Sequence, residues 1–322
     1  MPRPQVIAPQ FLTGPFCTAE FKESGYSHKL LLGRRFRRVH PRVWVATDHE
    51  MTYADEVLAA HLCMPSGARV TGSTRLRCLG LSFGAASPLH FVIDSDHHSA
   101  VEGIVLHRTA EMPPTDDVGV TPAAAFIAYC TSARLIDAIA VGDWLLHRHH
   151  ITIEELTALV HAQPWRDGAR EVRYLLDRLT PRSRSIPEST LRLLLLASGI
   201  VGLEVNAEVM TLDGRSLEID LLARRWNLAI EYDGAHHQER RDQYLTDIER
   251  HAALRAMHLE YTVVTKEHMT DSRSMVHRVH RVLLSRGYDG PPPHFGSRWR
   301  MLFRPVRELV RDRRGSTKSR QR

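Results

Sequence analysis

The chain has few of the features that mark secreted, membrane-spanning or zinc-binding proteins. Its 322 residues include 4 cysteines, and none of them forms a C-x-x-C pair. This argues against a disulfide framework and a structural zinc site, and favours a reducing cytoplasm. Residues 1–4 lack the apolar core of a signal peptide, and the most apolar run, residues 193–205, is too short to span a bilayer. We therefore expect a cytoplasmic protein with no membrane partner.

The remaining composition is that of an ordinary globular protein. Hydrophobic residues make up 43% and charged residues 25% of the chain. The length suggests two or three domains with real cores. The formal net charge is +6, and the positive charge is unevenly placed, which is typical of proteins that bind a polyanion.

An acidic residue stands near the end of each of two neighbouring, largely apolar stretches. The alternating residues before Asp220 and before Glu231 predict two hairpin strands, joined by a polar turn at residues 224–227. Side chains on one face of adjacent antiparallel strands lie within reach, and Glu231 and Asp233 share a face. Carboxylates brought together repel unless a cation lies between them, and all-oxygen ligands favour Mg²⁺ or Mn²⁺. The sequence therefore predicts a metal site of Asp220, Glu231 and Asp233; the alternative is solvated charges at a strand edge.

The sequence around this hairpin predicts a defined order of elements. Pro187 and Glu188 stand in the first turn of a helix that ends at Gly199. A strand precedes the hairpin, and a long helix, a last strand and a closing helix follow it, over residues 203–210, 238–257, 259–265 and 274–285. The order is αβββαβ plus one helix.

This order, with Glu188, Asp220 and Glu231 at their positions in it, resembles the PD-(D/E)XK nuclease fold. The run Glu-Tyr-Asp-Gly-Ala-His-His from Glu231, with Asp247 and Arg250 on the next helix, is similar to the domain-of-unknown-function family 559. That family resembles the very-short-patch repair endonucleases. The match covers about a third of the chain.

The resemblance implies roles for three acidic residues. Asp220 and Glu231 would bind the metal, which polarises a phosphate and lowers the pKa of a bound water. Glu188 would complete the site from its helix. A charge near the positive end of a helix dipole is the alternative explanation of Glu188.

One position departs from the pattern of the fold. A lysine is expected two residues after Glu231, and this chain has Asp233, which family 559 shares. An anion cannot stabilise the charge that develops on phosphate. Either a basic group comes from His236, His237 or Arg250, or Asp233 is a further metal ligand. At least one of the two histidines is also explained as a surface residue at a helix start.

The amino-terminal residues predict a second DNA-binding region. A helix begins near Thr18 and stops at Gly25, a second helix follows Ser27, and a hairpin turns at residues 40–42. Helix, turn, helix and wing resemble the winged helix-turn-helix of AbiEi-family antitoxins, which repress their own operons in type IV toxin–antitoxin systems. The resemblance implies DNA and a cognate toxin as partners. Phosphate contacts would come from Lys29, Arg34, Arg35, Arg37 and Arg38, with Arg250 as a further DNA-binding residue. The alternative is a small scaffold with a solvated basic edge.

The middle and the end of the chain contain no catalytic pattern. Residues 51–180 predict a mixed α/β domain that resembles the middle part of AbiEi-like proteins. Its helices and strands are predicted at residues 54–62, 68–80, 89–93, 103–107, 123–130, 135–147 and 168–179, and a further helix begins at Thr152. His97, His98 and the histidines of residues 147–150 are interpreted as surface residues. After Pro291, Pro292 and Pro293, we expect a short amphipathic helix at residues 304–311 and a disordered basic tail of the last ten or so residues.

Together these patterns predict an α+β multidomain protein. It comprises a winged helix-turn-helix (residues 1–50), a mixed α/β domain (51–180), a PD-(D/E)XK-like αβββαβ core (181–290) and a basic tail (291–322). The expected function is Mg²⁺-dependent endonuclease cleavage of DNA phosphodiester bonds. The alternative is an AbiEi-type antitoxin and transcriptional repressor whose nuclease-like domain is not catalytic. A third possibility is a fold retained without either activity.

Overall fold

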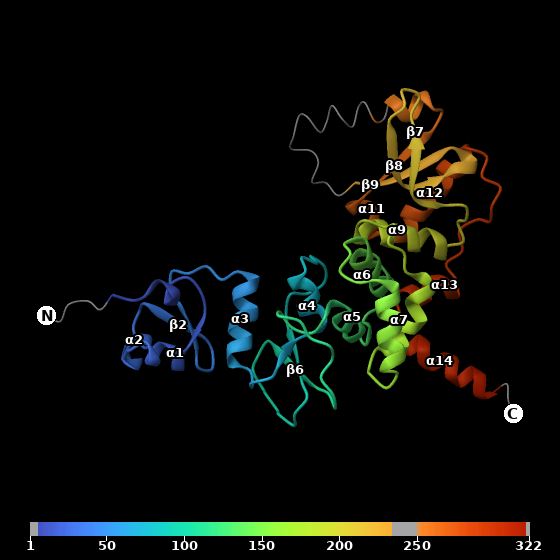
Figure 1. Ribbon diagram of the computed structural model, residues 1–322. Coiled ribbons are helices and arrows are strands. Elements are labelled where there is room, and N and C mark those ends of the chain that lie inside the picture. Colours follow the sequence, from blue (N-terminus) through green and yellow to red (C-terminus); the bar gives the residue numbers. More distant parts are fainter. Residues whose placement is uncertain (1–5, 234–249, 251, 320–322) are drawn as a thin grey trace. The chain divides into compact units, whose positions relative to one another are not determined.

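The computed structural model of the protein describes residues 6–233, 250 and 252–319. The chain divides into two compact units, residues 1–128 (unit 1) and 129–322 (unit 2) (Figure 1). Helices alternate with three small sheets in the described residues, which agrees with the predicted α+β class.

The amino-terminal part of unit 1 is a small antiparallel sheet with short helices. Phe11, Phe16 and Phe21 fill its core, with ring centroids 4.9–5.3 Å apart. The predicted hairpin is confirmed, and so is the helix start, because the Ser27 hydroxyl accepts a bond from Lys29 N at the first turn. The sheet order is β1-β3-β2. The elements are η1 Pro9–Phe11, β1 Phe16–Cys17, α1 Thr18–Glu23, α2 His28–Leu31, β2 Phe36–His40 and β3 Val43–Ala46.

The rest of unit 1 is built on a mixed sheet of order β4-β5-β6, in which β5 and β6 are parallel. A capping box at Thr52 and Asp55 starts the first helix, α3. The apolar side of α3 packs with Val43 of β3 and Phe91 of β5. The elements are α3 Tyr53–Cys63, β4 Arg69–Val70, α4 Gly72–Cys78, β5 Leu89–Ile93, β6 Ile104–Arg108 and α5 Pro122–Cys130.

Unit 2 begins with helices joined by a buried polar network. Asp143 of α6 accepts bonds from Ser189 Oγ at 2.8 Å and Arg192 Nη2 at 2.7 Å, both on α9. Thr180 N bonds the other carboxylate oxygen at 2.7 Å, which ties the segment between the helices to the same group. The helices are α6 Leu135–His147, α7 Ile153–Ala162, α8 Ala169–Leu175, η2 Leu176–Arg178 and α9 Ile186–Ala197.

The sheet of unit 2 has the order β10-β9-β8-β7, with β10 parallel to β9 and the other pairs antiparallel. Asn227 closes the predicted turn between β8 and β9 with a left-handed backbone, φ 50. Of the predicted helix 238–257, residue 250 and residues 252–256 are described as helical, and the remainder lies largely outside the described residues. The elements are β7 Glu204–Met210, β8 Ser216–Ala223, η3 Arg224–Trp226, β9 Leu228–Asp233 and β10 Glu260–Thr265.

The carboxy-terminal helices pack within unit 2. Trp299, Leu302 and Val306 are buried, and Val306 N donates to the carbonyl of Ala133 at 3.0 Å. The first half of the segment assigned to the basic tail is therefore packed. The last helix also runs on to Ser319, beyond the predicted residues 304–311. The helices are α11 Lys266–Thr270, which was not predicted, α12 Ser272–Ser285, α13 Ser297–Leu302 and α14 Val306–Ser319.

Candidate active site

Asp220 and Glu231 lie on β8 and β9, each directly beyond the last residue pair of the two strands. The register pairs Leu222 with Ala229 and Leu221 with Ile230. All four of these side chains are buried, so the strands are held firmly at this point. Asp220 and Glu231 are the next residue on each strand beyond this last pair. The predicted hairpin is therefore confirmed, and the meeting of the two carboxylates at a metal site stays a prediction.

The environment of Asp220 disfavours its charge. The carboxylate accepts one bond from Tyr232 N at 2.8 Å. Burial, together with the charges of Glu188 and Glu231, raises the pKa of Asp220 to about 7, against the opposing effects of the Tyr232 bond and Arg250. Near neutral pH, Asp220 therefore holds a proton about half of the time. A bound cation would relieve the same repulsion.

Glu188 comes to this point from the first turn of α9. The Ser185 hydroxyl caps the helix by accepting a bond from Glu188 N at 3.3 Å. The Glu188 carboxylate accepts a bond from Arg184 N at 2.9 Å. Glu188 thus has the helix-terminus role that was the alternative explanation, and its charge also acts on Asp220. The two explanations are compatible.

Arg250 is the described basic side chain that contacts these carboxylates. Its Nη2 donates to Glu231 Oε1 and to the carbonyl oxygen of Glu218. The side chains of Arg250 and Glu231 are only 26% and 18% exposed. Glu188, Asp220 and Glu231 carry three negative charges when all are ionised, and the Arg250 guanidinium, which pairs with Glu231, offsets one of them. Among the described residues, Arg250 is the basic candidate from the sequence that contacts one of these carboxylates, that of Glu231.

The donor set suits a hard divalent ion held by few protein ligands. In the described part of the chain, no group of three His, Cys, Asp or Glu side chains is arranged to hold a metal ion. Mg²⁺ is commonly held by one or two carboxylates, with water and substrate phosphate completing its shell. Asp220 and Glu231 fit that smaller requirement. The charge repulsion at Asp220 is the observation that supports this fit.

The other predicted site residues are placed less closely. Asp233 ends β9 opposite Thr265 of β10, and its charge contributes to the raised pKa of Tyr232, for which burial is the main cause. His236, His237 and Asp247 lie outside the described residues.

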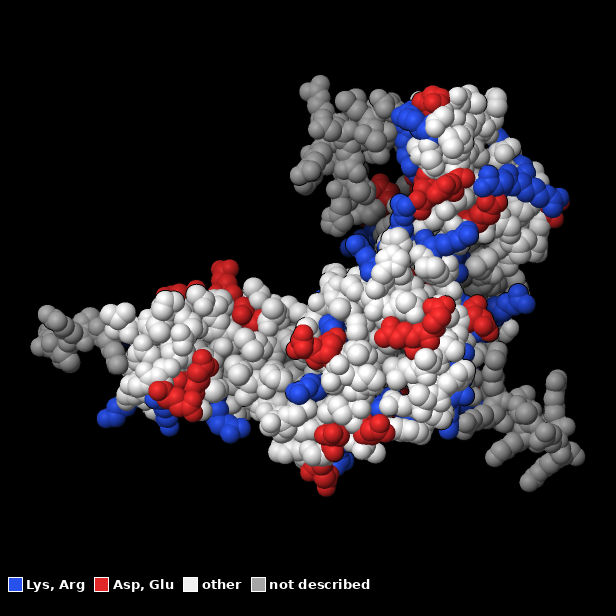
Figure 2. Space-filling model, viewed as in Figure 1, with Lys and Arg blue, Asp and Glu red and all other residues white. Residues whose placement is uncertain are grey.

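The predicted DNA-binding residues of the amino-terminal region form an exposed basic edge in unit 1. Figure 2 shows blue side chains along the lower edge of the part that carries α1 and α2. Arg37 also donates from Nη2 to the carbonyl of His49 at 3.4 Å, so the guanidinium of one of these side chains has a partner within unit 1. The exposed residues are Lys29, Arg34, Arg35, Arg37 and Arg38.

Sequence reasoning missed the buried network of Asp143, Ser189 and Arg192. The signal was present, because Asp143 interrupts an apolar helix and Arg192 interrupts a run of leucines. A charged residue on an apolar face usually has a buried partner. The partner could not be named from sequence, since Asp143 and Arg192 lie on helices far apart in the chain.

Comparison with family models, curated proteins and solved structures gave no match for this chain. The helices that the structure describes are all too short or too polar to cross a membrane.

Proposed function

We propose that unit 2 is a PD-(D/E)XK-like endonuclease domain that hydrolyses DNA phosphodiester bonds with Mg²⁺ or Mn²⁺. The observation that carries the proposal is the buried carboxylate of Asp220 on β8, whose pKa is raised further by the charges of Glu188 on α9 and Glu231 on β9. The helix before three antiparallel strands, and the parallel fourth strand, support the fold assignment. Perturbed pKa values of this origin are typical of functional sites.

Asp220 and Glu231 are the proposed metal ligands, and Glu188 supports them from α9. When bound, the ion would polarise the phosphate and lower the pKa of the attacking water. Arg250 has the positive charge that the fold ordinarily takes from a lysine at the position of Asp233. Its guanidinium lies against Glu231 and can neutralise charge that develops on a phosphate oxygen. Arg250 thus takes the role for which the fold ordinarily uses lysine.

The basic edge of unit 1 is proposed to contact DNA phosphates. Such contacts give sequence-independent, salt-sensitive affinity. Helix α2 has 4 residues, so it offers few side chains that could read bases. The same exposed edge favours the second candidate function, an AbiEi-type repressor with a winged helix-turn-helix and a cognate toxin.

The test is a titration of Mg²⁺ or Mn²⁺ into the wild type and into the Asp220→Ala/Glu231→Ala variant, followed by calorimetry. Each protein is then incubated with plasmid, mismatched and single-stranded DNA. We expect metal binding and cleavage in the wild type and neither in the variant, with DNA affinity retained. Glu204→Ala is the matched control, because Glu204 is an exposed carboxylate of the same sheet.

Two outcomes separate the candidates. A wild type that binds no metal at millimolar concentration and cuts no DNA excludes the endonuclease proposal. A repressor is indifferent to Asp220→Ala and Glu231→Ala. It loses operator binding when Arg34, Arg35 and Arg37 are changed to glutamine.

A further inference from the structure

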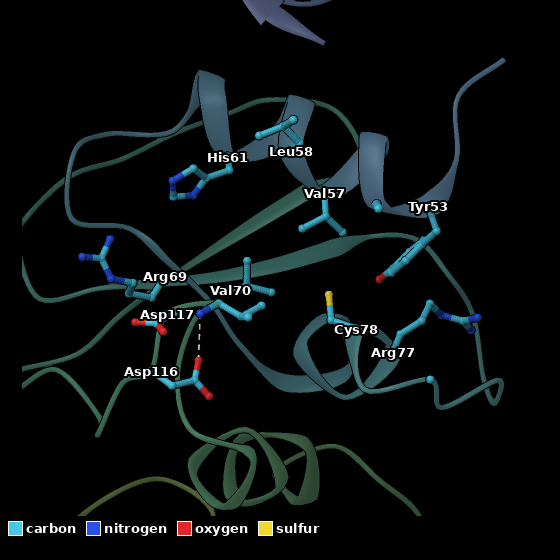
Figure 3. A pocket seen from close by; sticks show the side chains of 13 residues that line it. Tyr53, Val57, Leu58, His61, Arg69, Val70, Arg77, Cys78, Asp116 and Asp117 are labelled. Atoms are coloured by element: carbon cyan, nitrogen blue, oxygen red, sulfur yellow. Dashed lines mark hydrogen bonds between the residues drawn. The ribbon is translucent and has the colours of Figure 1, made fainter. Parts of the chain in front are cut away.

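A pocket of about 840 Å³ lies in unit 1 between α3 and the segment that contains β4 and α4 (Figure 3). This volume is within the range of sites that enclose small organic molecules. Tyr53, Val57 and His61 line it from α3. They are four residues apart, so they follow one face of the helix. The opposite wall includes Val70 of β4 and Cys78 of α4.

The lining is apolar in the middle and polar at both ends. In Figure 3, Val57, Leu58 and Val70 lie between a group around Arg69 on one side and the pair of Tyr53 and Arg77 on the other. Leu58 is 43% exposed although it is a large apolar side chain. Covering this surface with an apolar ligand would be favourable by the hydrophobic effect.

The acidic residues at the pocket offset only part of its positive charge. Asp116 is already neutralised: it accepts a bond from Arg75 Nη2 at 2.6 Å and further bonds from two backbone N–H groups. Arg69 and Arg77 then face one remaining carboxylate, that of Asp117. The lining therefore has an excess of one positive charge.

The guanidinium groups of Arg69 and Arg77 differ in how many contacts they make within the protein. Arg77 Nη2 donates to the carbonyls of Phe83 and Gly84, and its guanidinium lies over the Tyr53 ring, 5.4 Å from the centroid. Arg69 donates from Nη1 to the carbonyl of Ala68 at 3.3 Å, and its guanidinium has further N–H groups. Arg69 is therefore the better placed anchor for an anion.

His61 lies near Arg69 at the same end of the pocket (Figure 3). Burial, and then the charge of Arg69, lower the pKa of His61, so the imidazole is neutral at pH 7 and can both donate and accept a hydrogen bond. This end of the pocket thus offers a cation and a neutral polar group together.

We propose that this pocket binds a small amphipathic organic anion, with an aromatic body against Val57, Leu58 and Val70 and its anionic group at Arg69. The inference goes beyond the proposed nuclease function and does not depend on it. Apolar walls with a few polar groups at the ends are the usual composition of a small-molecule site. The guanidinium can donate two parallel hydrogen bonds to two oxygens of a carboxylate or of a sulfonate.

The test uses the full chain and two fluorescent probes of similar shape. Anilinonaphthalene sulfonate has an aromatic body with an anionic group, and N-phenylnaphthylamine lacks that group. We expect saturable binding of the sulfonate at one site, about tenfold tighter than the neutral probe, since a hydrogen bond to a charged group contributes this much. Arg69→Gln should weaken sulfonate binding about tenfold and leave the neutral probe unaffected.

Three variants locate the site. Ala54→Trp adds bulk at an exposed position on the pocket face of α3 and should abolish binding of both probes. Leu58→Glu places a negative charge in the middle of the pocket and should repel the sulfonate most. Arg108→Gln is the matched control, because Arg108 is an exposed arginine of the same unit that does not line the pocket. Thermal melting by circular dichroism shows that each variant is folded.

The proposal is overturned if the wild type does not bind the sulfonate, or if it binds both probes equally. It is also overturned if Arg69→Gln behaves like Arg108→Gln, or if folded Ala54→Trp and Leu58→Glu proteins bind the sulfonate as the wild type does. Cleavage of DNA plays no part in these measurements, so their outcome is separate from that of the nuclease test.

Discussion

In the described part of unit 2, burial is the main cause of a raised pKa at Asp143 and at Asp220, and the surroundings of these two aspartates differ. The Asp143 carboxylate accepts bonds from Thr180 N, Ser189 Oγ and Arg192 Nη2, so one cation and two further donors balance its charge. The Asp220 carboxylate accepts a bond from Tyr232 N and lies close enough to two other carboxylates for them to raise its pKa further.

We propose that this difference separates a structural charge from a functional one. The charge of Asp143 is complemented by the fold itself and joins α6 to α9. The charge of Asp220 is only partly complemented, by Arg250 at a distance. Carboxylates that repel one another in this way are typical of functional sites, where a ligand such as a bound cation neutralises them.

The largest expected effect comes from breaking the Asp143 network. Arg192→Met would leave the Asp143 carboxylate buried without its cation and should lower the free energy of unfolding by about 3–5 kcal/mol. Urea denaturation at pH 7 measures it. The double variant Asp143→Leu/Arg192→Met should recover most of the loss, because no buried charge remains. A loss below about 1 kcal/mol in the single variant would contradict the structural role.

Asp220→Asn should change the free energy of unfolding in the opposite direction and stabilise the fold. In the folded protein the pKa of Asp220 is about 7, against an ordinary value of 3.8. The folded state therefore binds the proton more tightly, and stability falls as pH rises from about 4 to about 7 and is level above that. Removing the charge should raise the free energy of unfolding by about 2–4 kcal/mol at pH 8 and by little at pH 4.

The measurement is urea denaturation in EDTA at pH 4, 5.5 and 8, with Glu204→Gln as the exposed control. Asparagine keeps an oxygen that can accept the bond from Tyr232 N. A variant that is equally stabilised at all three pH values would show that repulsion at Asp220 is not the cause.

Metal binding should release a proton from Asp220. A ligand carboxylate must be ionised, so at pH 7 binding of Mn²⁺ should release about half a proton, and affinity should fall about tenfold between pH 8 and pH 6. Calorimetry in two buffers of different ionisation enthalpy measures the release. Binding that is independent of pH across this window would place the metal elsewhere.

Arg250→Gln tests the cation that already lies at the site. Arg250 pairs with Glu231 and opposes the pKa rise of Asp220. Its removal should tighten Mn²⁺ binding about fivefold, since a partly exposed ion pair contributes about 1 kcal/mol. Cleavage should nevertheless slow, because the charge that faces the phosphate is lost. Weaker metal binding and unchanged cleavage would assign Arg250 a purely structural role.

Local sequence patterns predicted most elements of the fold. Helix α6 was predicted at its observed bounds, and the caps at Ser185 and Thr152 gave the starts of α9 and α7. Short helices were harder: α11 has 5 residues, too few for a periodic pattern. The packing of the carboxy-terminal helices was not predicted, because the burial of Trp299 depends on helices far away in the sequence.

The candidate site could be predicted in part because Asp220 and Glu231 belong to one local hairpin. The alternation of apolar and polar residues in the sequence indicated the two strands of that hairpin. The bond from Tyr232 N to Asp220 also forms within this hairpin. The contacts of Arg250 with Glu231 and with the Glu218 carbonyl come from outside the hairpin and depend on the tertiary arrangement.

The smallest effect is expected at an ion pair on the surface of the same sheet. Arg224 donates from Nε and Nη2 to the Glu204 carboxylate, and the two side chains are 55% and 45% exposed. Water and salt screen such a pair, so Arg224→Gln should change the free energy of unfolding by less than about 0.5 kcal/mol, and less still at high salt. Denaturation at low and high ionic strength measures this. A loss of free energy of unfolding comparable to that of Arg192→Met would mean that burial is not what distinguishes Asp143 from exposed carboxylates. The different surroundings of Asp143 and Asp220 would then not explain different roles.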